Sequence, residues 1–453
     1  MSATAHDMVN QAQQPQRTLV VGLGVTGLSV ARFLAARGVE VAVTDSRETP
    51  PGLEAIRREL PDVALFIGGF DASIFARAER IVLSPGVALS EPLLLEAKAR
   101  GVEIIGDIEL FARSAVAPVI GITGSNGKST VTTLVGEMAR QAGKDVRTGG
   151  NLGTPALDLL QAQEPDFYVL ELSSFQLETL SSLRCLAATV LNISADHLDR
   201  YASIEAYADA KRQVYAGAQV QVVNRDDVAA AALASAGKTV SFGLNKPAEG
   251  DFGIIDSGAG EWIVRGGERW MPVAHLRLPG RHNLANALAA LALGEAAGLD
   301  RNAMLQVLRE FQGLPHRTQW VAERNGVAWY NDSKATNTGA ALAAVQGFDT
   351  PLVLIAGGQG KDADFHGFAV GVENHVKAVV LIGEAADEIE QALAGRVVVQ
   401  RAASLEAAVQ AADVLASPGD SVLLSPACAS FDMFANYQAR GESFVRAVQE
   451  LGR

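Results

Sequence analysis

Short apolar runs alternate with amphipathic stretches along most of the chain. We predict strands at the apolar runs TLVVGLG, VEVAVTD, RIVLSPG, APVIGITG, DFYVLELSS, AATVLNIS, VAWYNDS, PLVLIAGG, AVVLIG and SVLLSPA. The stretches LSVARFLAARG, VTTLVGEMARQAG and HNLANALAALALGEAAG predict helices, the first ending at Gly38. Because strands that alternate with helices pair in parallel through right-handed crossovers, the pattern predicts an α/β fold with parallel sheets.

The pattern divides the chain into three units. It restarts near Ala117 and again near Gly313, and a length of 453 residues suits about three domains of ordinary size. We expect a disordered, polar tail first, and then the three units, at residues 1–16, 17–107, 108–312 and 313–453.

The composition excludes several classes of protein. A hydrophobic fraction of 48% and a charged fraction of 20% argue against a disordered chain, collagen or a coiled coil. No apolar run approaches the roughly 18 residues of a membrane span, and the N-terminus lacks the apolar segment of a secretory signal. The net charge of −13 disfavours nucleic acid as a partner. Since Cys185 and Cys428 make no disulfide framework, we expect structural cysteines and a cytoplasmic protein.

The first glycine motif, GLGVTG at residues 22–27, follows a predicted strand and opens a predicted helix. Glycines there let the backbone approach a diphosphate, and the helix N-terminus adds partial positive charge. Asp45 ends the next predicted strand, where it can accept hydrogen bonds from ribose hydroxyls. The motif indicates a diphosphate but leaves NAD and a UDP-sugar open, and a tight turn that needs only small residues is the structural alternative.

The second glycine motif, GITGSNGKST at residues 121–130, is the strongest signal in the chain. Its first glycine comes one position too early for the strict P-loop pattern. Gly124 and Gly127 can still form a nest of backbone N–H groups. Lys128 can reach the β- and γ-phosphates, and Ser129 or Thr130 can bind Mg²⁺. We therefore predict an ATP site.

The segment TGSNGKST resembles the variant P-loop of the Mur ligase family, the ATP-dependent amide-forming enzymes of peptidoglycan synthesis. Similar blocks follow in the family's order: GGNLGTPAL, LELSSFQLE, NISADHLDRY, LPGRHNLANALAA, GLPHR, NDSKATN, GGQGKDADF and LLSPACASFDMF. The resemblance implies a Rossmann-like UDP-binding domain at 17–107 and a central ATP-binding domain at 108–312. It also implies a Rossmann-like C-terminal domain at 313–453 that binds D-glutamate and closes on ATP.

The same resemblance implies ATP-driven amide formation by a monomer. D-glutamate would be joined to UDP-N-acetylmuramoyl-L-alanine through an acyl phosphate, with ADP and phosphate as products. Two negatively charged oxygens approach each other in the phosphoryl transfer, so lysines and metal ions must neutralise charge.

The resemblance also assigns residues to the ATP and metal sites. Glu171 and His197 each follow an apolar strand, and with Ser129 they would hold two Mg²⁺ ions. Lys211 matches a lysine that is carbamylated by CO₂ in the family, and its carbamate would also bind Mg²⁺. From the residues alone Lys211 is an ordinary helix lysine, and the adjacent Arg212 leaves a one-residue ambiguity. The catalytic set would be Lys128, Glu171, His197 and Lys211. The implied ATP contacts are Gly124, Ser125, Asn126, Gly127, Lys128, Ser129, Thr130, Asn283, Asn286, Arg317 and Asp332.

Two further groups match substrate contacts of the family. The UDP-linked substrate would be bound by Gly24, Val25, Thr26, Gly27, Asp45, Ser46, Arg47, Ser84, Gly86 and Asn151. D-glutamate, a dicarboxylate that needs cations and hydrogen-bond donors, would be bound by Lys334, Thr336, Lys361, Ser430 and Phe431. Gln359 and Tyr437 differ from some relatives, and we assign them no role.

Three other functions remain open. A folylpolyglutamate synthase would share the ATP domain but gives no reason for the first glycine motif. An NAD-dependent oxidoreductase leaves Lys128 and Ser129 unexplained. A non-catalytic nucleotide-binding module does not account for Lys128, Glu171 and His197 together.

Overall fold

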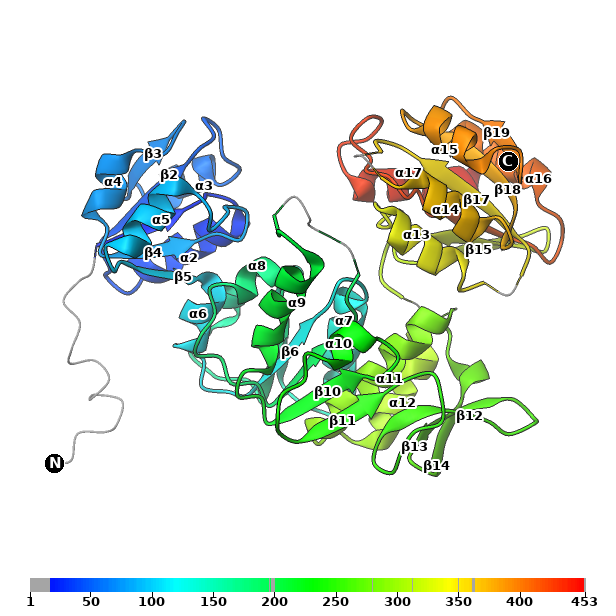
Figure 1. The fold of residues 1–453 in the computed structure, drawn as a ribbon, viewed down its shortest axis with the longest axis horizontal. Helices are drawn as coiled ribbons and strands as arrows, with labels where there is room; N and C mark the ends of the chain where they lie inside the picture. The colour runs from blue at the N-terminus through cyan, green and yellow to red at the C-terminus, as the bar shows by residue number, and fades with distance from the viewer. Residues whose placement is uncertain are drawn as a thin grey trace. The chain divides into compact units, whose positions relative to one another are not determined.

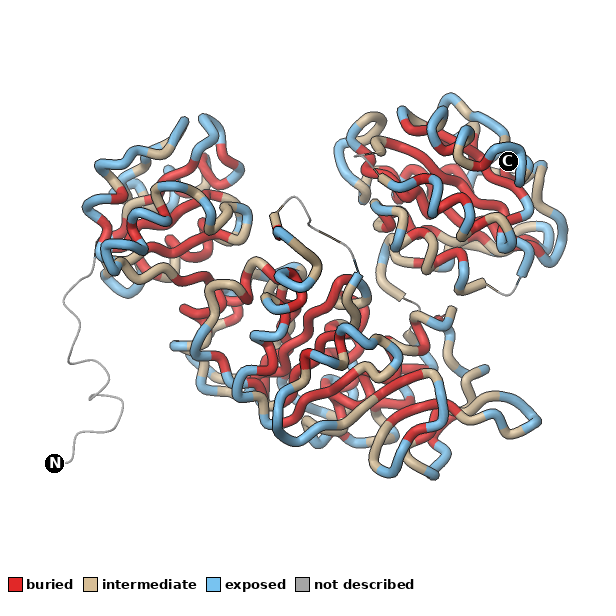
Figure 2. The backbone as a smooth tube through the Cα atoms, in the orientation of Figure 1, coloured by how far each residue is buried: buried red, intermediate tan, exposed pale blue. Residues whose placement is uncertain are grey.

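The computed structural model describes residues 17–194, 196, 200–278, 280–311, 313–348, 350–360 and 363–451. The tail expected at residues 1–16 lies outside this part of the chain. Two compact units are present, one formed by the chain up to Phe242 with Ala289–Met304, the other by Gly243–Leu288 with the chain from Leu305 onward. In both units the strands carry much of the buried sequence (Figure 2).

Five parallel strands form the N-terminal sheet, in the order β3-β2-β1-β4-β5 (Figure 1). Val20 packs on one face of the sheet with residues of α2 and α3, whereas Leu19 packs on the other with residues of α4 and α5. The elements are β1 (Thr18–Val21), α2 (Val25–Ala35), β2 (Val41–Asp45), α3 (Leu53–Glu59), β3 (Ala64–Ile67), α4 (Ala72–Arg77), β4 (Arg80–Leu83), α5 (Pro92–Ala99) and β5 (Glu103–Gly106).

Helix α2 differs in its bounds from the sequence prediction. It starts earlier than expected, directly after Gly24, and it ends at Ala35 rather than Gly38. Gly38 has a φ of +71°, which reverses the chain after the helix, and Val39 donates its N–H to Leu34 O at 3.2 Å. The glycine is therefore a turn residue beyond the last helical turn.

Within the first unit, the second sheet contributes six parallel strands, in the order β11-β10-β9-β6-β8-β7. The elements are α6 (Asp107–Ala112), β6 (Val119–Thr123), α7 (Lys128–Gln141), β7 (Val146–Gly150), the 3₁₀ turn η1 (Ala156–Leu159), β8 (Phe167–Glu171), α8 (Ser174–Leu177), β9 (Ala187–Val190), α9 (Ile204–Arg212), η2 (Gln213–Tyr215), β10 (Val220–Asn224), α10 (Val228–Ala231) and β11 (Thr239–Phe242).

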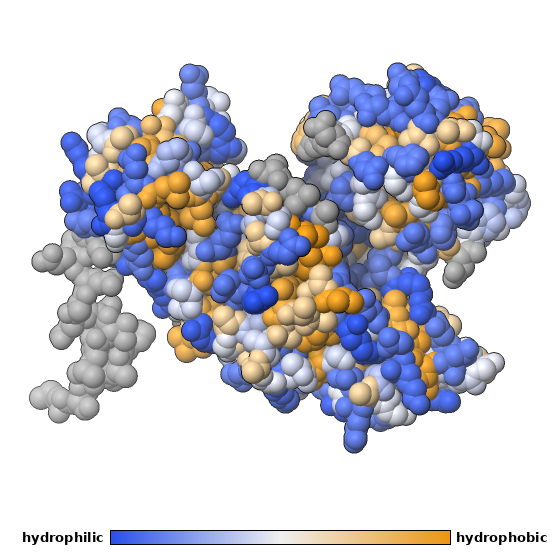
Figure 3. All heavy atoms as spheres, in the orientation of Figure 1, coloured by the Kyte–Doolittle hydropathy of each residue, from blue (hydrophilic) through white to orange (hydrophobic). Residues whose placement is uncertain are grey.

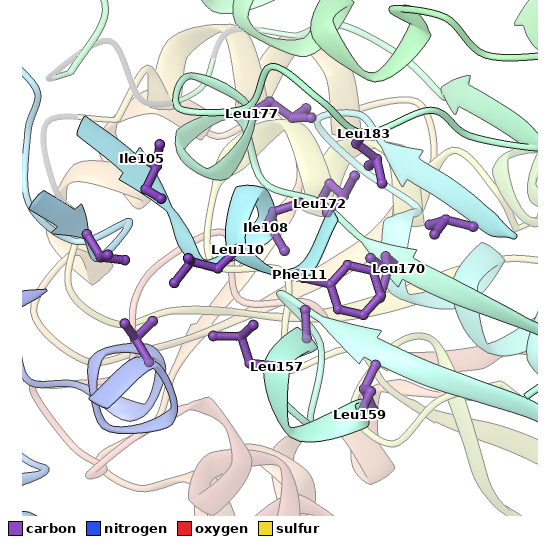
Figure 4. Close-up of a cluster of buried hydrophobic side chains, with 14 of the residues drawn as sticks. Ile105, Ile108, Leu110, Phe111, Leu157, Leu159, Leu170, Leu172, Leu177 and Leu183 are labelled. Atoms are coloured by element: carbon purple, nitrogen blue, oxygen red, sulfur yellow. The ribbon is translucent and has the colours of Figure 1, made fainter. Parts of the chain in front are cut away.

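The two sheets of this unit share one apolar cluster, which we call the junction core. It contains Val20 from the N-terminal sheet and Leu170 from β8, together with Ile108, Leu110 and Phe111 of α6. Figure 4 shows the labelled side chains of α6 among leucines of η1, β8 and α8. The first two domains are therefore joined by buried apolar surface as well as by the chain.

Hydrogen bonds to acidic side chains hold α6 in place. Gln176 Nε2 donates to Asp107 Oδ2 at 3.0 Å, and the backbone N–H groups of Ser181 and Ser182 donate to Glu109 Oε2 at 2.8 and 2.9 Å. Burial raises the pKa of Glu109, but these bonds and Arg113 outweigh it and bring the pKa to about 2.

The second unit contains an antiparallel set of strands and the C-terminal sheet. Strands β12 and β13 pair antiparallel, as do β13 and β14. The elements before the C-terminal sheet are β12 (Phe252–Asp256), β13 (Glu261–Arg265), β14 (Glu268–Pro272) and η3 (Val273–His275), followed by α11 (Arg281–Ala296) and α12 (Arg301–Glu310). The sequence prediction missed these three strands, although Gly-rich turns at 257–260 and 266–267 separate them.

The C-terminal sheet has the order β15-β16-β20-β17-β18-β19. All its pairs are parallel except β15 with β16. Helices α13, α14 and α15 cover one face, and α16 and α17 the other. The elements are β15 (Gln319–Arg324), β16 (Val327–Asn331), α13 (Thr338–Val345), β17 (Leu352–Gly357), α14 (Phe365–Val372), β18 (Val376–Ile382), α15 (Ala386–Leu393), β19 (Val398–Arg401), α16 (Leu405–Leu415), β20 (Ser421–Leu424) and α17 (Tyr437–Glu450).

Among the residues that the structure describes, no helix is both long and apolar enough to cross a membrane. On the face drawn in Figure 3, hydrophilic side chains surround scattered hydrophobic ones.

Candidate active site

The second glycine motif forms the loop between β6 and α7, as the sequence predicts. Gly124 has a φ of +147° and Gly127 a φ of +83°, conformations that side chains with a Cβ rarely adopt. A Cβ on Gly124 would also lie 3.0 Å from the Cβ of Leu191. Both glycines are therefore required by the backbone of this loop.

Lys128 begins α7 and lies back over the loop. Its Nζ donates to the carbonyl oxygens of Gly124 at 2.8 Å and Ser125 at 2.9 Å. The loop is tied in turn to the segment after β9, because the N–H of Ser125 donates to Asn192 O at 3.0 Å and that of Asn126 to Asn192 Oδ1 at 2.8 Å. Asn192, which the sequence analysis did not select, thus holds the loop in place at both residues.

Ser129 and Glu171 meet beneath the loop. Ser129 Oγ donates to Glu171 Oε2 at 2.6 Å, and Asn151 Nδ2 donates to Glu171 Oε1 at 2.7 Å. Glu171 is only 3% exposed, and no cationic side chain of the described chain lies within ion-pair distance of its carboxylate. The structure therefore brings Ser129, Asn151 and Glu171 together around a buried carboxylate, and such a group is costly unless a cation compensates its charge.

Lys211 lies on the buried side of α9, at 1% exposure, and reaches the same loop. Its Nζ donates to Gly124 O at 2.9 Å, so it shares that carbonyl with Lys128. Burial, and then the charge of Lys128, lower the pKa of Lys211 well below its ordinary value. The adjacent Arg212 is half exposed and pairs with Asp209 at 3.0 Å. The structure therefore separates the two candidates: Lys211 faces the loop and Arg212 faces solvent.

His197 lies outside the described residues. The described part of the chain contains no cluster of three or more His, Cys, Asp or Glu side chains that could hold a metal ion. A metal at this loop would therefore need the serine hydroxyl, the phosphates or a modified side chain as further ligands.

The first glycine motif forms the turn between β1 and α2. A Cβ on Gly27 would lie 1.8 Å from Gly22 O, whereas nothing lies within 4 Å of a Cβ on Gly24. Ser84 Oγ donates to Gly22 O at 2.8 Å and closes the turn from β4. Gly86 has open space on its Cβ side, and Val25 is exposed. The first turn of α2 has no side-chain cap, so its N–H groups are available to an anion.

Asp45 is engaged by the protein itself. Leu23 N donates to Asp45 Oδ2 at 2.7 Å, and Arg47 donates from its backbone N and its guanidinium at 2.9, 2.8 and 2.7 Å. Burial raises the pKa of Asp45, but these hydrogen bonds outweigh it and bring the pKa to about 2. Ser46 and the Arg47 side chain are exposed beside it. The ribose contact expected of Asp45 stays a prediction.

Four of the predicted ATP contacts belong to the second unit. Asn283 and Asn286 are buried one turn apart on α11, with Asn286 Nδ2 at 3.4 Å from Asn283 Oδ1. Asp332 accepts hydrogen bonds from Ser425 Oγ at 2.8 Å and from Thr318 N at 3.0 Å. Burial raises its pKa to about 7. Arg317 precedes Thr318 in the same segment.

The predicted D-glutamate residues come from two neighbouring segments. Arg440, which is 1% exposed, donates from Nη2 to Ser333 O at 2.9 Å and to Cys428 O at 3.1 Å, and thereby ties the segments of Lys334 and Ser430 together. The predicted residues Thr336 and Ser430 are at least partly buried, whereas Phe431 is exposed. Lys361 lies outside the described residues.

Two residues left without a role make contacts here. Lys334 Nζ lies 4.2 Å from the ring centroid of Tyr437. The backbone N–H of Gln359 donates to Ala429 O at 2.9 Å, next to Ser430. The sequence analysis missed Arg440, although a signal was present: it shares a helical stripe with Phe444, Ala447 and Val448, so an arginine stands where an apolar residue is expected.

Both cysteines are free and buried. Burial raises the pKa of each thiol to about 12. A thiol with such a pKa is not a nucleophile at neutral pH, which agrees with the structural role expected of Cys185 and Cys428.

Two features of the chain are typical of a nucleotide-dependent enzyme. One is the glycine loop at 121–130, where Lys128 lies over the loop and the buried Glu171 accepts a hydrogen bond from Ser129. The other is the separate glycine turn at 22–27, which suits a diphosphate. Three family models match the chain in succession. These are "Mur ligase MurD-like, N-terminal domain" at residues 16–106, "Mur ligase middle domain" at 122–294 and "Mur ligase, glutamate ligase domain" at 316–428. The chain belongs to the Mur ligase family, and its predicted three-domain α/β fold is confirmed.

The chain is similar over nearly its full length to relatives named UDP-N-acetylmuramoylalanine–D-glutamate ligase. The relative from Nitrosococcus oceani is 55% identical over 450 residues, which are 98% of this chain and 99% of the relative. That from Pseudomonas savastanoi pv. phaseolicola is 54% identical over 438 residues, 96% and 98% of the two chains. The solved structure of UDP-N-acetylmuramate–alanine ligase from Thermotoga maritima has a TM-score of 0.61 at 19% identity, covers 96% of this chain and 99% of its own, and shows the same fold.

Proposed function

We propose that the chain is an ATP-dependent ligase that joins D-glutamate to UDP-N-acetylmuramoyl-L-alanine in the cytoplasm, as a monomer. The observation that carries the proposal is the identity of 55% over 98% of the chain with a relative of that name. The grouping of Lys128, Ser129, Glu171 and Lys211 around one loop supports it, because an oxidoreductase or a non-catalytic module has no use for two lysines on one loop carbonyl.

The proposed domains are those expected from the sequence. Residues 17–107 would bind the UDP end through Gly24, Val25, Thr26, Gly27, Asp45, Ser46, Arg47, Ser84 and Gly86. Residues 108–312 would bind ATP, and residues 313–453 would bind D-glutamate through Lys334, Thr336, Lys361, Ser430 and Phe431. The contact of Asn151 with Glu171 supports a role for Asn151 near the reacting carboxylate.

The donors on the loop fit Mg²⁺, which prefers oxygen ligands. Ser129 Oγ and the Glu171 carboxylate would hold one ion, and His197 with a modified Lys211 would hold a second. When bound, Mg²⁺ neutralises charge on the phosphates and so lets two anionic groups approach.

Carbamylation of Lys211 is part of the proposal. The reaction needs a neutral amine: the Nζ lone pair attacks CO₂, and Nζ loses a proton to solvent. Burial and then the charge of Lys128 lower the pKa of Lys211 well below its ordinary value, which favours the neutral amine that the reaction needs. The product is an oxygen-bearing anion in a position where an ammonium would repel Lys128.

The residues of this chain then serve two steps. In the first, an oxygen of the substrate carboxylate attacks the γ-phosphorus of ATP while Lys128 and the loop N–H groups hold the phosphates, giving an acyl phosphate and ADP. In the second, the amine of D-glutamate attacks the acyl carbon, phosphate leaves, and the amine loses a proton. Exclusion of water protects the acyl phosphate between the steps.

The test is phosphate release from ATP in the presence of both acceptor and D-glutamate. We expect release only when UDP-N-acetylmuramoyl-L-alanine and D-glutamate are both present, and we expect oxygen-18 from the acceptor's carboxylate to reach the phosphate. The Lys128→Ala variant should lose this activity, whereas Lys144→Ala, an exposed lysine of the same domain, should keep it. Release with folate and glutamate, or NADH formation, would select one of the alternatives.

A further inference from the structure

Arg200 lies where the segment after β9 meets the N-terminal domain. Its guanidinium is 4.3 Å from the ring centroid of Phe175. Its Nη1 is 3.5 Å from Pro85 O and its Nη2 is 3.4 Å from Val87 O. Both distances are longer than the usual 2.7–3.2 Å of a hydrogen bond from nitrogen, so the guanidinium makes only weak bonds to the loop after β4.

Among the described residues, no carboxylate lies within ion-pair distance of the Arg200 guanidinium. A guanidinium has five N–H donors in a planar fork, and two of them reach an acceptor in the described part of the chain. The side chain is nevertheless partly buried, and a cation in such a position favours a bound anion.

The loop that Arg200 contacts is the wall of the first glycine turn. Ser84 Oγ donates to Gly22 O at 2.8 Å, and a Cβ on Gly22 would lie 3.3 Å from a methyl of Val87. Beside them, Gly86 has no atom within 4 Å on its Cβ side. The loop after β4 therefore contacts both the Arg200 guanidinium and the first glycine turn, whose N–H groups suit a diphosphate.

An aromatic stack holds Arg200 in this place. Phe175, under the guanidinium, stacks on Tyr201 with ring centroids 5.9 Å apart at 7°. Tyr201 meets Tyr207 edge to face at 5.3 Å, and the hydroxyl of Tyr207 is 3.1 Å from Ser125 Oγ in the ATP loop. The side chain is thus positioned in advance, which lowers the entropy cost of using it in binding.

We propose that Arg200 is a further substrate-binding residue, and that from its place against the loop after β4 it contacts the diphosphate of the nucleotide-linked substrate at the first glycine turn. The planar fork of arginine matches phosphate oxygens with paired hydrogen bonds. The inference rests on the proposed function, since it takes the turn at 22–27 as the UDP site. It adds a contact from the middle domain to a diphosphate otherwise bound by the N-terminal domain.

The experiment compares binding of UDP and uridine to the full-length protein and its variants by calorimetry. Arg200→Met keeps the length of the side chain and removes its charge, and Arg200→Lys keeps the charge without the fork. We expect Arg200→Met to weaken UDP binding by at least about tenfold, to leave uridine and ATP binding within twofold, and Arg200→Lys to fall between. Arg140→Met, an exposed arginine paired with Glu137 on α7, is the matched control and should bind UDP normally.

Other results would overturn the inference. Unchanged UDP binding in Arg200→Met, or equal losses for UDP and uridine with a lower Tm, would assign Arg200 a structural role only. If the unaltered protein binds neither UDP nor the UDP-linked substrate, the proposed function fails first, and this contact fails with it.

Discussion

Replacing Asp107 by asparagine should stabilise the protein at neutral pH. Asp107 begins α6 at the junction core and is 2% exposed. Its Oδ2 accepts a hydrogen bond from Gln176 at 3.0 Å, but its Oδ1 has no hydrogen-bond partner among the residues that the structure describes. Burial raises the pKa of this carboxyl from 3.8 to about 6, against the smaller opposing effect of Gln176. At pH 7 the folded protein therefore carries a buried, poorly solvated charge.

The size of the effect follows from linkage. A carboxyl with a raised pKa keeps its proton in the folded state between pH 3.8 and about 6, while the unfolded chain has lost it. The stabilising contribution of the protonated carboxyl is thus complete below pH 3.8, the pKa in the unfolded chain, and is lost as the pH rises to about 6, the pKa in the folded protein. At about 1.4 kcal/mol per pH unit, the raised pKa costs the folded state about 2 kcal/mol at pH 5, where only the unfolded chain is ionised, and about 3 kcal/mol at pH 7.

The assay is urea unfolding of the full-length protein between pH 5 and pH 8, with and without the substitution. The asparagine side chain keeps an acceptor for Gln176 and has no charge to bury. We expect Asp107→Asn to gain about 3 kcal/mol in the free energy of unfolding at pH 7 and a smaller amount, about 2 kcal/mol, at pH 5. Asp71→Asn, at an exposed helix cap where asparagine serves equally well, should show no such gain.

The reasoning would be refuted by a variant that is no more stable than the parent at pH 7. It would also be refuted if the gain were the same at pH 5 and pH 7, because the effect would then come from packing rather than from a proton.

Three further substitutions test the nucleotide sites. Glu171→Gln should lower phosphate release by at least about 100-fold, since it removes a buried charge that a metal would use, with Tm unchanged; activity within threefold of the parent would contradict this. Lys211→Ala should cause a similar loss, and millimolar formate or acetate should restore part of the activity; a complete absence of rescue counts against the carbamate. Gly27→Ala places a Cβ 1.8 Å from Gly22 O and should cost about 1–3 kcal/mol in chemical unfolding, whereas Gly24→Ala, with open space, should leave stability unaltered.

Local patterns in the sequence predicted the α/β class and ten of the strands that the structure describes. The buried strands of all three sheets are continuous apolar runs, and the ATP loop is defined by residues adjacent in the chain, so Ser129 and Lys128 could be selected without a structure. The antiparallel strands β12–β14 and β15 were missed because they are short and mix polar with apolar residues. They also stand outside the alternation of strands and helices on which the prediction relied.

Residues that act through long-range contacts were harder to judge. Lys211 resembled a solvated helix lysine, yet it lies four residues after the buried Tyr207 on one face of α9, and only the packing of that face against the ATP loop reveals its burial. Asp107 and Asn192 were not singled out by any local chemistry, and the only local signal for Arg440 was its place in an apolar helical stripe. Their roles depend on partners 66 to 107 residues away in the chain, a distance over which periodicity carries no information.

The junction core has a consequence for any attempt to divide this protein. The side chains of Ile108, Leu110 and Phe111 lie in one cluster with both Val20 and Leu170. A polypeptide that stops at Gly106 would expose apolar side chains of β5 and α2 to solvent. A polypeptide that begins at Asp107 would expose the apolar side chains of α6 that pack against them. Chimaeras between relatives should therefore exchange the first two domains together, with the junction between the two parent sequences placed after the second domain.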